Sequence, residues 1–167
     1  MVLPKTSVLG QPDAARAGSG LAFPEIGPDP VQILSVSPVE DDHVTLKRVL
    51  SGTGCVVRKA LSLRSGLAQL DIELAPVVIC ERDLMPGSWR DLLIALRGFR
   101  EPPFLIVTSR QADEVLWSQA LNLGAYDVLA KPFDAAEIVR VVSLAWLHWR
   151  DQYPADSMDS LRVMAAH

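Results

Sequence analysis

The sequence lacks the features that place a protein in or across a membrane. It has no uninterrupted apolar run of the roughly 18 residues that a membrane-spanning helix needs. Residues 1–20 also lack the basic start and the continuous apolar block of a secretory signal peptide. These absences predict a cytoplasmic protein without a membrane segment.

Several kinds of binding site are also missing. The formal net charge is −4 and no basic stripe stands out, which argues against nucleic-acid binding. Cys55 and Cys80 form no CxxC pair and no cluster with histidines, so no zinc site is indicated. Both cysteines lie in apolar segments, where we expect reduced, buried thiols rather than a disulfide. A small-molecule sensor is a weaker possibility, because the chain has no glycine-rich phosphate loop.

The chain of 167 residues is long enough for one well-buried core, and its 49% hydrophobic and 22% charged residues are typical of a soluble globular protein. Proline and glycine interrupt residues 1–30, which we interpret as a disordered or loosely packed arm. Residues 31–150 form the predicted domain. Residues 151–167 form a tail too short for an output domain, so we expect a stand-alone module.

Short apolar runs alternate with amphipathic segments throughout the predicted domain. The pattern predicts five strands, at 31–36, 55–60, 76–80, 104–107 and 127–130. A helix follows each strand, at 41–50, 63–74, 89–98, 112–123 and 134–150. The expected fold is therefore α/β, a doubly wound parallel five-stranded sheet with helices on both faces. In such folds the functional crevice lies beyond the carboxyl ends of the strands.

The segment VICERDLMPG, residues 78–87, ends the third apolar run with three consecutive charged residues and a Pro-Gly turn. Counted from the strand, Glu81 is the first residue at the functional edge of the sheet. Two further features fall at the same edge: Thr108 ends the fourth strand, and GAYDVLAKPFD, residues 124–134, leads from the fifth strand into Lys-Pro-Phe.

Together these features resemble the bacterial response-regulator receiver (CheY-like) domain over residues 31–150. The resemblance implies a flavodoxin-like (βα)5 fold and a role in two-component, phosphorelay signal transduction. Members of the family accept a phosphoryl group from a histidine kinase on an Asp after the third strand. They hold Mg²⁺ partly through an acidic pair after the first strand, and a hydroxyl residue and a lysine contact the phosphoryl oxygens.

Only part of this pattern is present here. By the resemblance, Lys131 is the phosphate-sensing lysine and Thr108 the switch hydroxyl, and both suit an anion. Ser37 and Pro38, however, stand where the family has its acidic pair. The switch aromatic three positions before the lysine is replaced by Val128.

Three acids follow shortly after the missing pair, at Glu40, Asp41 and Asp42. We interpret them as the first turn of a helix, where negative side chains complement the helix dipole without any ligand. The alternative is a displaced metal site.

Two ways of counting place different residues at the acceptor position. The turn places Arg82 there, whereas the strand places Glu81 there. We favour the strand, because register slips in a buried strand are costly and loops tolerate shifts. Glu81 would then hold a fixed negative charge near Lys131 and Thr108 and imitate part of the activated state.

The sequence therefore predicts an atypical, degenerate receiver that works without phosphorylation. Without the acidic pair we expect no Mg²⁺ binding and little phosphoryl transfer, so the protein is a signalling module and not an enzyme. It would act through contacts with a protein partner, either a histidine kinase or a downstream signalling protein. The alternative is a weakly phosphorylatable receiver that uses Asp83, or Asp41 and Asp42, with Mg²⁺.

The last predicted helix is apolar around more of its circumference than a core-facing stripe requires. Val139, Trp146 and Leu147 remain outside that stripe. They either form an exposed patch for a homodimer or a partner, or lie under the arm or the tail.

Overall fold

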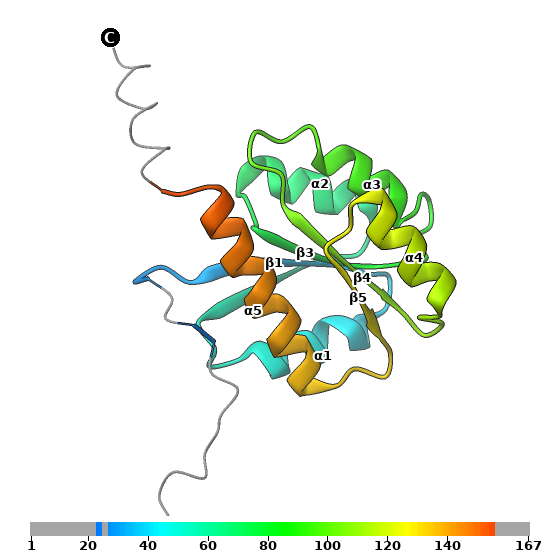
Figure 1. The fold of residues 1–167 in the computed structure, drawn as a ribbon, viewed down its shortest axis with the longest axis horizontal. Coiled ribbons are helices and arrows are strands. Elements are labelled where there is room, and N and C mark those ends of the chain that lie inside the picture. The colour runs from blue at the N-terminus through cyan, green and yellow to red at the C-terminus, as the bar shows by residue number, and fades with distance from the viewer. Residues whose placement is uncertain (1–22, 25–26, 156–167) are drawn as a thin grey trace, which may run out of the picture.

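The computed structural model describes residues 23–24 and 27–155, which form a sheet of five strands with five helices (Figure 1). The strands are β1 (Val31–Val36), β2 (Cys55–Ala60), β3 (Val77–Glu81), β4 (Phe104–Ser109) and β5 (Asp127–Ala130). The helices are α1 (Glu40–Leu50), α2 (Leu63–Ile72), α3 (Trp89–Leu96), α4 (Glu114–Leu123) and α5 (Ala135–Gln152). The predicted elements are all present, with ends that differ by a few residues.

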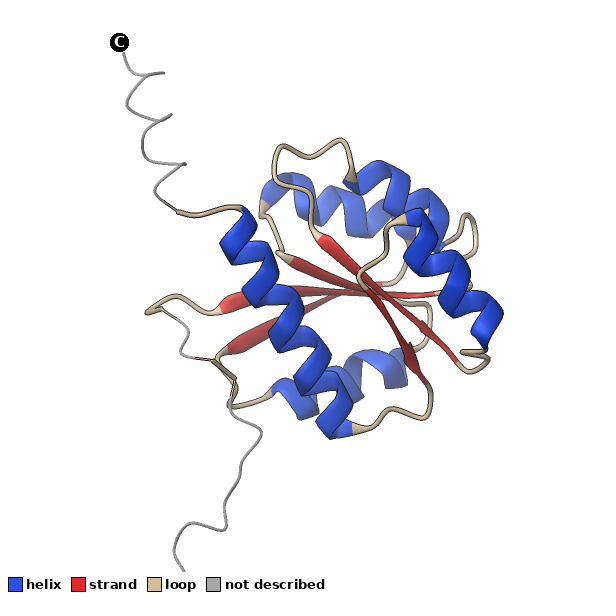
Figure 2. Ribbon diagram, viewed as in Figure 1, coloured by secondary structure: helices blue, strands red, loops and turns tan. Residues whose placement is uncertain are grey.

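All strand pairs are parallel, and the strand order is β2-β1-β3-β4-β5. Helices α1 and α5 cover one face of the sheet, and α2, α3 and α4 cover the other (Figures 1 and 2). The predicted doubly wound, flavodoxin-like fold is confirmed. Strand order reverses between β1 and β3, so the functional crevice of such a fold lies beyond their carboxyl ends.

Alternation along the central strands divides the core into two apolar layers. Val78 and Cys80 of β3 face the α2, α3 and α4 side, whereas Val77 and Ile79 face the α1 and α5 side. Every residue of β3 is buried, as expected for a central parallel strand. Each large apolar side chain buried in this way stabilises the fold by about 1.5–3 kcal/mol. Because β3 is buried on both faces, its register is fixed, and this register places Glu81 at the carboxyl edge of the sheet.

Local side chains define where the later helices begin and end. Asp113 accepts a hydrogen bond from the backbone N–H of Leu116 at the start of α4, and Asp134 caps α5 in the same way. Gly124 ends α4 with φ 105°, a left-handed conformation that glycine adopts without strain. The peptide bond between Lys131 and Pro132 is cis. These signals fix the segment between α4 and α5, including β5 and the Lys-Pro-Phe triplet.

Helix α5 is packed more deeply than an exposed binding patch allows. Val139 and Trp146 are 5% and 8% exposed, and Leu147 is partly buried. The ring centroids of Phe23 and Trp146 lie 6.2 Å apart, and the Arg150 guanidinium lies 4.9 Å from the Trp146 ring. The exposed-patch interpretation is therefore wrong for Val139 and Trp146, because the domain core buries the first and Phe23 and Arg150 cover the second.

The remainder of the arm and tail interpretation falls on residues 1–22, 25–26 and 156–167, which lie outside the described residues. Among the helices that are described, none combines the length and apolar character that a membrane crossing requires.

Cys55 and Cys80 are both free thiols. Burial raises the pKa of each thiol above its ordinary value, which keeps both in the unreactive, protonated form at neutral pH.

Replacing Phe23 with Ala tests its contact with α5. We expect the free energy of unfolding to fall by about 1–2 kcal/mol, because apolar contact area on Trp146 is lost. Iodide should also quench tryptophan emission more strongly than in the wild type. Phe23→Leu keeps an apolar cover and should retain most of the stability. Unchanged stability and quenching in Phe23→Ala would show that this contact does not cover α5 in solution.

Candidate functional site

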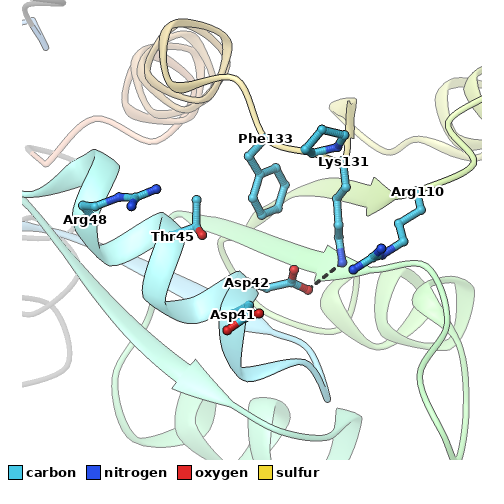
Figure 3. Close-up of a pocket in the computed structure, with 8 residues that line it drawn as sticks. Asp41, Asp42, Thr45, Arg48, Arg110, Lys131 and Phe133 are labelled. Atoms are coloured by element: carbon cyan, nitrogen blue, oxygen red, sulfur yellow. Dashed lines mark hydrogen bonds and ion pairs between the residues drawn. The ribbon is translucent and has the colours of Figure 1, made fainter.

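The ammonium group of Lys131 lies between two carboxylates at the carboxyl edge of the sheet. Its Nζ is 2.6 Å from Asp42 Oδ2, as the dashed line in Figure 3 marks, and it forms a second ion pair with Glu81 Oε2. The side chains of Lys131 and Asp42 are 9% exposed and that of Glu81 is 10% exposed. One cation is thus shared by two nearly buried anions that come from α1 and β3.

Glu81 is the last residue of β3, and its neighbours hold its side chain in place. Its register partner on β4 is Thr108, whose Oγ1 donates to Glu81 Oε2 at 3.4 Å. The backbone N–H of Asp83 donates to Glu81 Oε1 at 3.3 Å. The structure therefore brings Glu81, Thr108 and Lys131 together.

Ser37 and Pro38, which follow β1, lie differently. Ser37 is buried, and its hydroxyl donates to Asp42 Oδ2 at 2.6 Å while accepting from the Val39 N–H at 3.1 Å. Pro38 is exposed and lines a hollow in front of Glu81. Ser37 therefore reaches the centre indirectly, through Asp42.

Glu40, Asp41 and Asp42 stand in the first turn of α1, as predicted, but the helix dipole does not account for the whole role of Asp42. Of the three acids in the first turn of α1, Glu40 pairs with Lys59 at 2.9 Å, and Asp41 is exposed. Asp42 is 7% exposed and pairs with Lys131. The burial of Asp42 could have been predicted from the sequence, because Asp42 lies four positions before the core residue Leu46 on the same helical face.

His43 is a buried residue that the sequence analysis missed. Its Nε2 lies 2.9 Å from the carbonyl oxygen of Ser37, and its Nδ1 lies 2.8 Å from Ser35 Oγ. A carbonyl can only accept, so Nε2 carries a hydrogen, and in the neutral ring Nδ1 accepts from the Ser35 hydroxyl. The sequence signal that could have indicated a buried polar partner is the pair Ser35 and Ser37 at the otherwise apolar end of β1. His43 fixes the backbone of Ser37, which in turn orients Asp42.

Arg82 does not reach between the charged groups. Its guanidinium donates to Asp83, with Nη2 2.9 Å from Oδ2, and these hydrogen bonds raise the pKa of Arg82 above its ordinary value. Asp83 has a side chain that is 68% exposed, and it lines the same hollow of about 330 Å³ as Glu81 and Lys131. The count from the turn, which would put Arg82 at the centre, does not match this geometry.

No aromatic side chain stands at the expected switch position. Val128 is fully buried, and Tyr126 lies at the start of β5, at the opposite edge of the sheet. Tyr126 stacks on Phe104 with ring centroids 5.4 Å apart, and its hydroxyl is 2.7 Å from His148 Nδ1. Thr108 therefore has only Glu81 as a side-chain hydrogen-bond partner within the described residues.

The oxygen donors at the edge of the sheet are few. Residues 23–24 and 27–155 contain no group of three or more His, Cys, Asp or Glu side chains placed to hold a metal ion. Asp42 and Glu81 are the two carboxylates beside Lys131, and both are ion-paired with it.

Comparison with known proteins identifies this arrangement. The family model of the response regulator receiver domain matches residues 36–143. The chain belongs to this family. Its receiver domain is 32% identical over 117 residues to the acid tolerance regulatory protein ActR of Rhizobium meliloti, covering 68% of this chain and 58% of ActR. It is 29% identical over 105 residues to the KDP operon transcriptional regulatory protein KdpE of Escherichia coli, covering 60% and 45%. The matches thus span about half the length of these relatives.

Solved structures show the same fold. A putative response regulator from Chloroflexus aurantiacus is 27% identical with a TM-score of 0.66, covering 71% of this chain and 99% of that one. The chemotaxis response regulator CheY4 of Vibrio cholerae is 16% identical with a TM-score of 0.63, covering 70% and 98%, and is alike in fold. The protein is accordingly a receiver domain of two-component signalling with a CheY-like, flavodoxin-like fold.

Removing the shared cation should destabilise the receiver domain strongly. Lys131→Met leaves two nearly buried carboxylates without a cation to neutralise them, and we expect the free energy of unfolding at neutral pH to fall by about 3–5 kcal/mol. Adding Glu81→Gln removes one of the two unpaired charges and should recover part of the loss. Urea denaturation of the single and double variants measures both effects.

Lys59→Met is the matched control, because Lys59 pairs with Glu40 on the exposed surface and should matter little. If Lys131→Met were no more destabilising than Lys59→Met, the three charges would not be coupled as described.

Proposed function

We propose that this receiver domain signals without phosphorylation, with Glu81 at the position of the phosphoacceptor Asp. One observation carries the proposal: the ammonium group of Lys131 is ion-paired with Glu81 and with Asp42. In the receiver family this lysine contacts an incoming phosphoryl group. Here its positive charge is already taken up by carboxylates of the chain itself.

The donor set does not fit a magnesium site. Mg²⁺ requires oxygen ligands in nearly octahedral geometry, and Ser37 and Pro38 replace the two acids that the family supplies after the first strand. Asp42 and Glu81 would have to release Lys131 before they could coordinate a cation. Phosphoryl transfer depends on positioning and charge neutralisation. With the lysine engaged and the acidic pair absent, neither requirement is met.

Glu81 supplies a negative charge that does not depend on a kinase. Thr108 donates to the same Glu81 oxygen that contacts Lys131, so the two phosphate-sensing groups of the family converge on a carboxylate of the chain. The state of the domain is then fixed by its sequence and by its partners. This is the arrangement expected of a receiver held in an activated-like form.

The activity that follows is protein binding rather than catalysis. A histidine kinase or a downstream signalling protein is the partner class, and the relatives ActR and KdpE are named as regulatory proteins. A homodimer through the last helix stays a prediction. The large apolar residue that α5 exposes is Leu144, at 39%, whereas Val139 and Trp146 are buried. A cytoplasmic location also stays an expectation from the sequence.

One structural observation favours a second candidate, a weakly phosphorylatable receiver that uses Mg²⁺. Asp42 lies at the centre beside Lys131, and Asp83 opens onto the hollow in front of Glu81. Either carboxylate could then serve as an acceptor, with Asp41 nearby on α1. Against this, Asp42 is held by Lys131 and Ser37, and Asp83 is held by Arg82.

Incubation with acetyl phosphate and Mg²⁺, followed by intact mass, tests the proposal. We expect no phosphoryl adduct on the wild type or on Glu81→Asp alone. An adduct should appear when Glu81→Asp is combined with Ser37→Asp and Pro38→Asp, because that variant restores both the acceptor and the acidic pair. Asp83→Asn in the restored background is the control, and labelling should persist there.

The opposite result would be a Mg²⁺-dependent adduct on the wild-type chain. If that adduct disappeared in Asp83→Asn or in Asp42→Asn, the second candidate would be correct and the named residue would be the acceptor.

A further inference from the structure

A hollow of about 520 Å³ lies between α1 and the segment that follows β5, beside the charged centre (Figure 3). Thr45 and Arg48 line it from α1, Arg110 lines it from the end of β4, and Phe133 follows Lys131 and Pro132 along the third side. Its volume is within the roughly 300–1,000 Å³ of small-molecule sites. Nothing in the receiver chemistry described above uses Arg48 or Phe133.

The charged lining favours an anion. The guanidinium groups of Arg48 and Arg110 extend toward the hollow from opposite sides (Figure 3). Among the described residues neither of them forms an ion pair. Two carboxylates, of Asp41 and Asp42, also line the hollow, but Asp42 is paired with Lys131. The two arginines therefore outnumber the one remaining carboxylate, and guanidinium groups bind carboxylates and phosphates well.

The side of the hollow formed by Pro132 and Phe133 is apolar. Phe133 is partly buried against the core beneath α1 and α5, and its ring stands over the hollow close to Thr45 in Figure 3. Pro132 extends the same wall. Aromatic rings favour stacked or edge-on contacts with other flat apolar groups. The hydroxyl of Thr45 and the carboxylate of Asp41 add polar groups that can bond to a hydroxyl or amino substituent.

We propose that this hollow binds a small organic anion that combines one carboxylate or phosphate group with a flat apolar part. The acidic group would bind the guanidinium of Arg48, and the apolar part would lie against Phe133, which stands between Arg48 and Arg110 (Figure 3). This activity goes beyond the proposed signalling role and requires neither Mg²⁺ nor phosphoryl transfer. Lys131 lines both this hollow and the hollow in front of Glu81. A molecule bound here would therefore lie next to the ion pair between Lys131 and Asp42.

An NMR titration of the full chain tests the proposal. The probes are phenyl phosphate, benzoate and inorganic phosphate, each added at constant ionic strength without Mg²⁺. We expect saturable shifts of backbone amides in α1 and near Phe133 with phenyl phosphate or benzoate, and weaker binding of inorganic phosphate, which lacks the ring. The preferred acid group distinguishes a phosphate ligand from a carboxylate ligand.

Arg48→Gln and Phe133→Leu should each raise the dissociation constant, by about tenfold for Arg48→Gln because one charge-assisted contact is lost. Lys47→Gln is the matched control, since it removes the same charge from the neighbouring position of α1 without altering the lining, and it should leave binding unchanged.

Three results would overturn the proposal: no saturable shifts with any probe at millimolar concentration, an equal loss in Lys47→Gln and Arg48→Gln, or loss in Arg110→Gln while Arg48→Gln binds normally. The last would place the anion in front of Glu81, which Arg110 also lines, rather than in this hollow.

Discussion

The charged centre at the carboxyl edge of the sheet depends on one cation shared by two nearly buried carboxylates. Lys131 joins the end of β5 to α1 through Asp42 and to β3 through Glu81, so a single ammonium group ties three elements together at the carboxyl edge of the sheet. Buried ion pairs are weak evidence for net stability, but removing one partner leaves charge without compensation. The hydrogen bonds from Ser37, Thr108 and the Asp83 backbone also depend on Lys131, because each is made to one of the two carboxylates that Lys131 holds.

If Glu81 replaces the acceptor Asp as we propose, this arrangement explains how the receiver fold persists with altered acceptor chemistry. The fold requires the register of β3 and the packing of α1 and α5, which the apolar layers supply. The chemistry of the family requires an acidic pair, an acceptor Asp, and a hydroxyl residue and a lysine that contact the phosphoryl oxygens. In this chain the lysine is ion-paired with Asp42 and Glu81, and we propose that partners act on the interaction surfaces of the domain.

The sequence predicted the fold well because it depends on patterns that are local and repeated. Five apolar runs with helical segments between them and an unbroken run in β3 left little freedom. The strand register also placed Glu81 opposite Thr108. The pairing of Asp42 with Lys131 was missed because a carboxylate in the first turn of a helix has a sufficient local explanation, whereas Lys131 is 89 positions away. The sequence left open that the arm covers Trp146, but it could not single out Phe23, because this contact spans most of the chain.

A Mg²⁺ titration followed by two-dimensional NMR tests the central claim most directly, because it asks whether the carboxylates are free to bind a cation. The account predicts no saturable shifts at the amides of Glu81, Asp83 and Asp42 at millimolar Mg²⁺, since Lys131 occupies both carboxylates and the acidic pair is absent. Saturable shifts confined to those amides would contradict it, and would mean that Lys131 yields its place to a metal ion as in a phosphorylatable receiver.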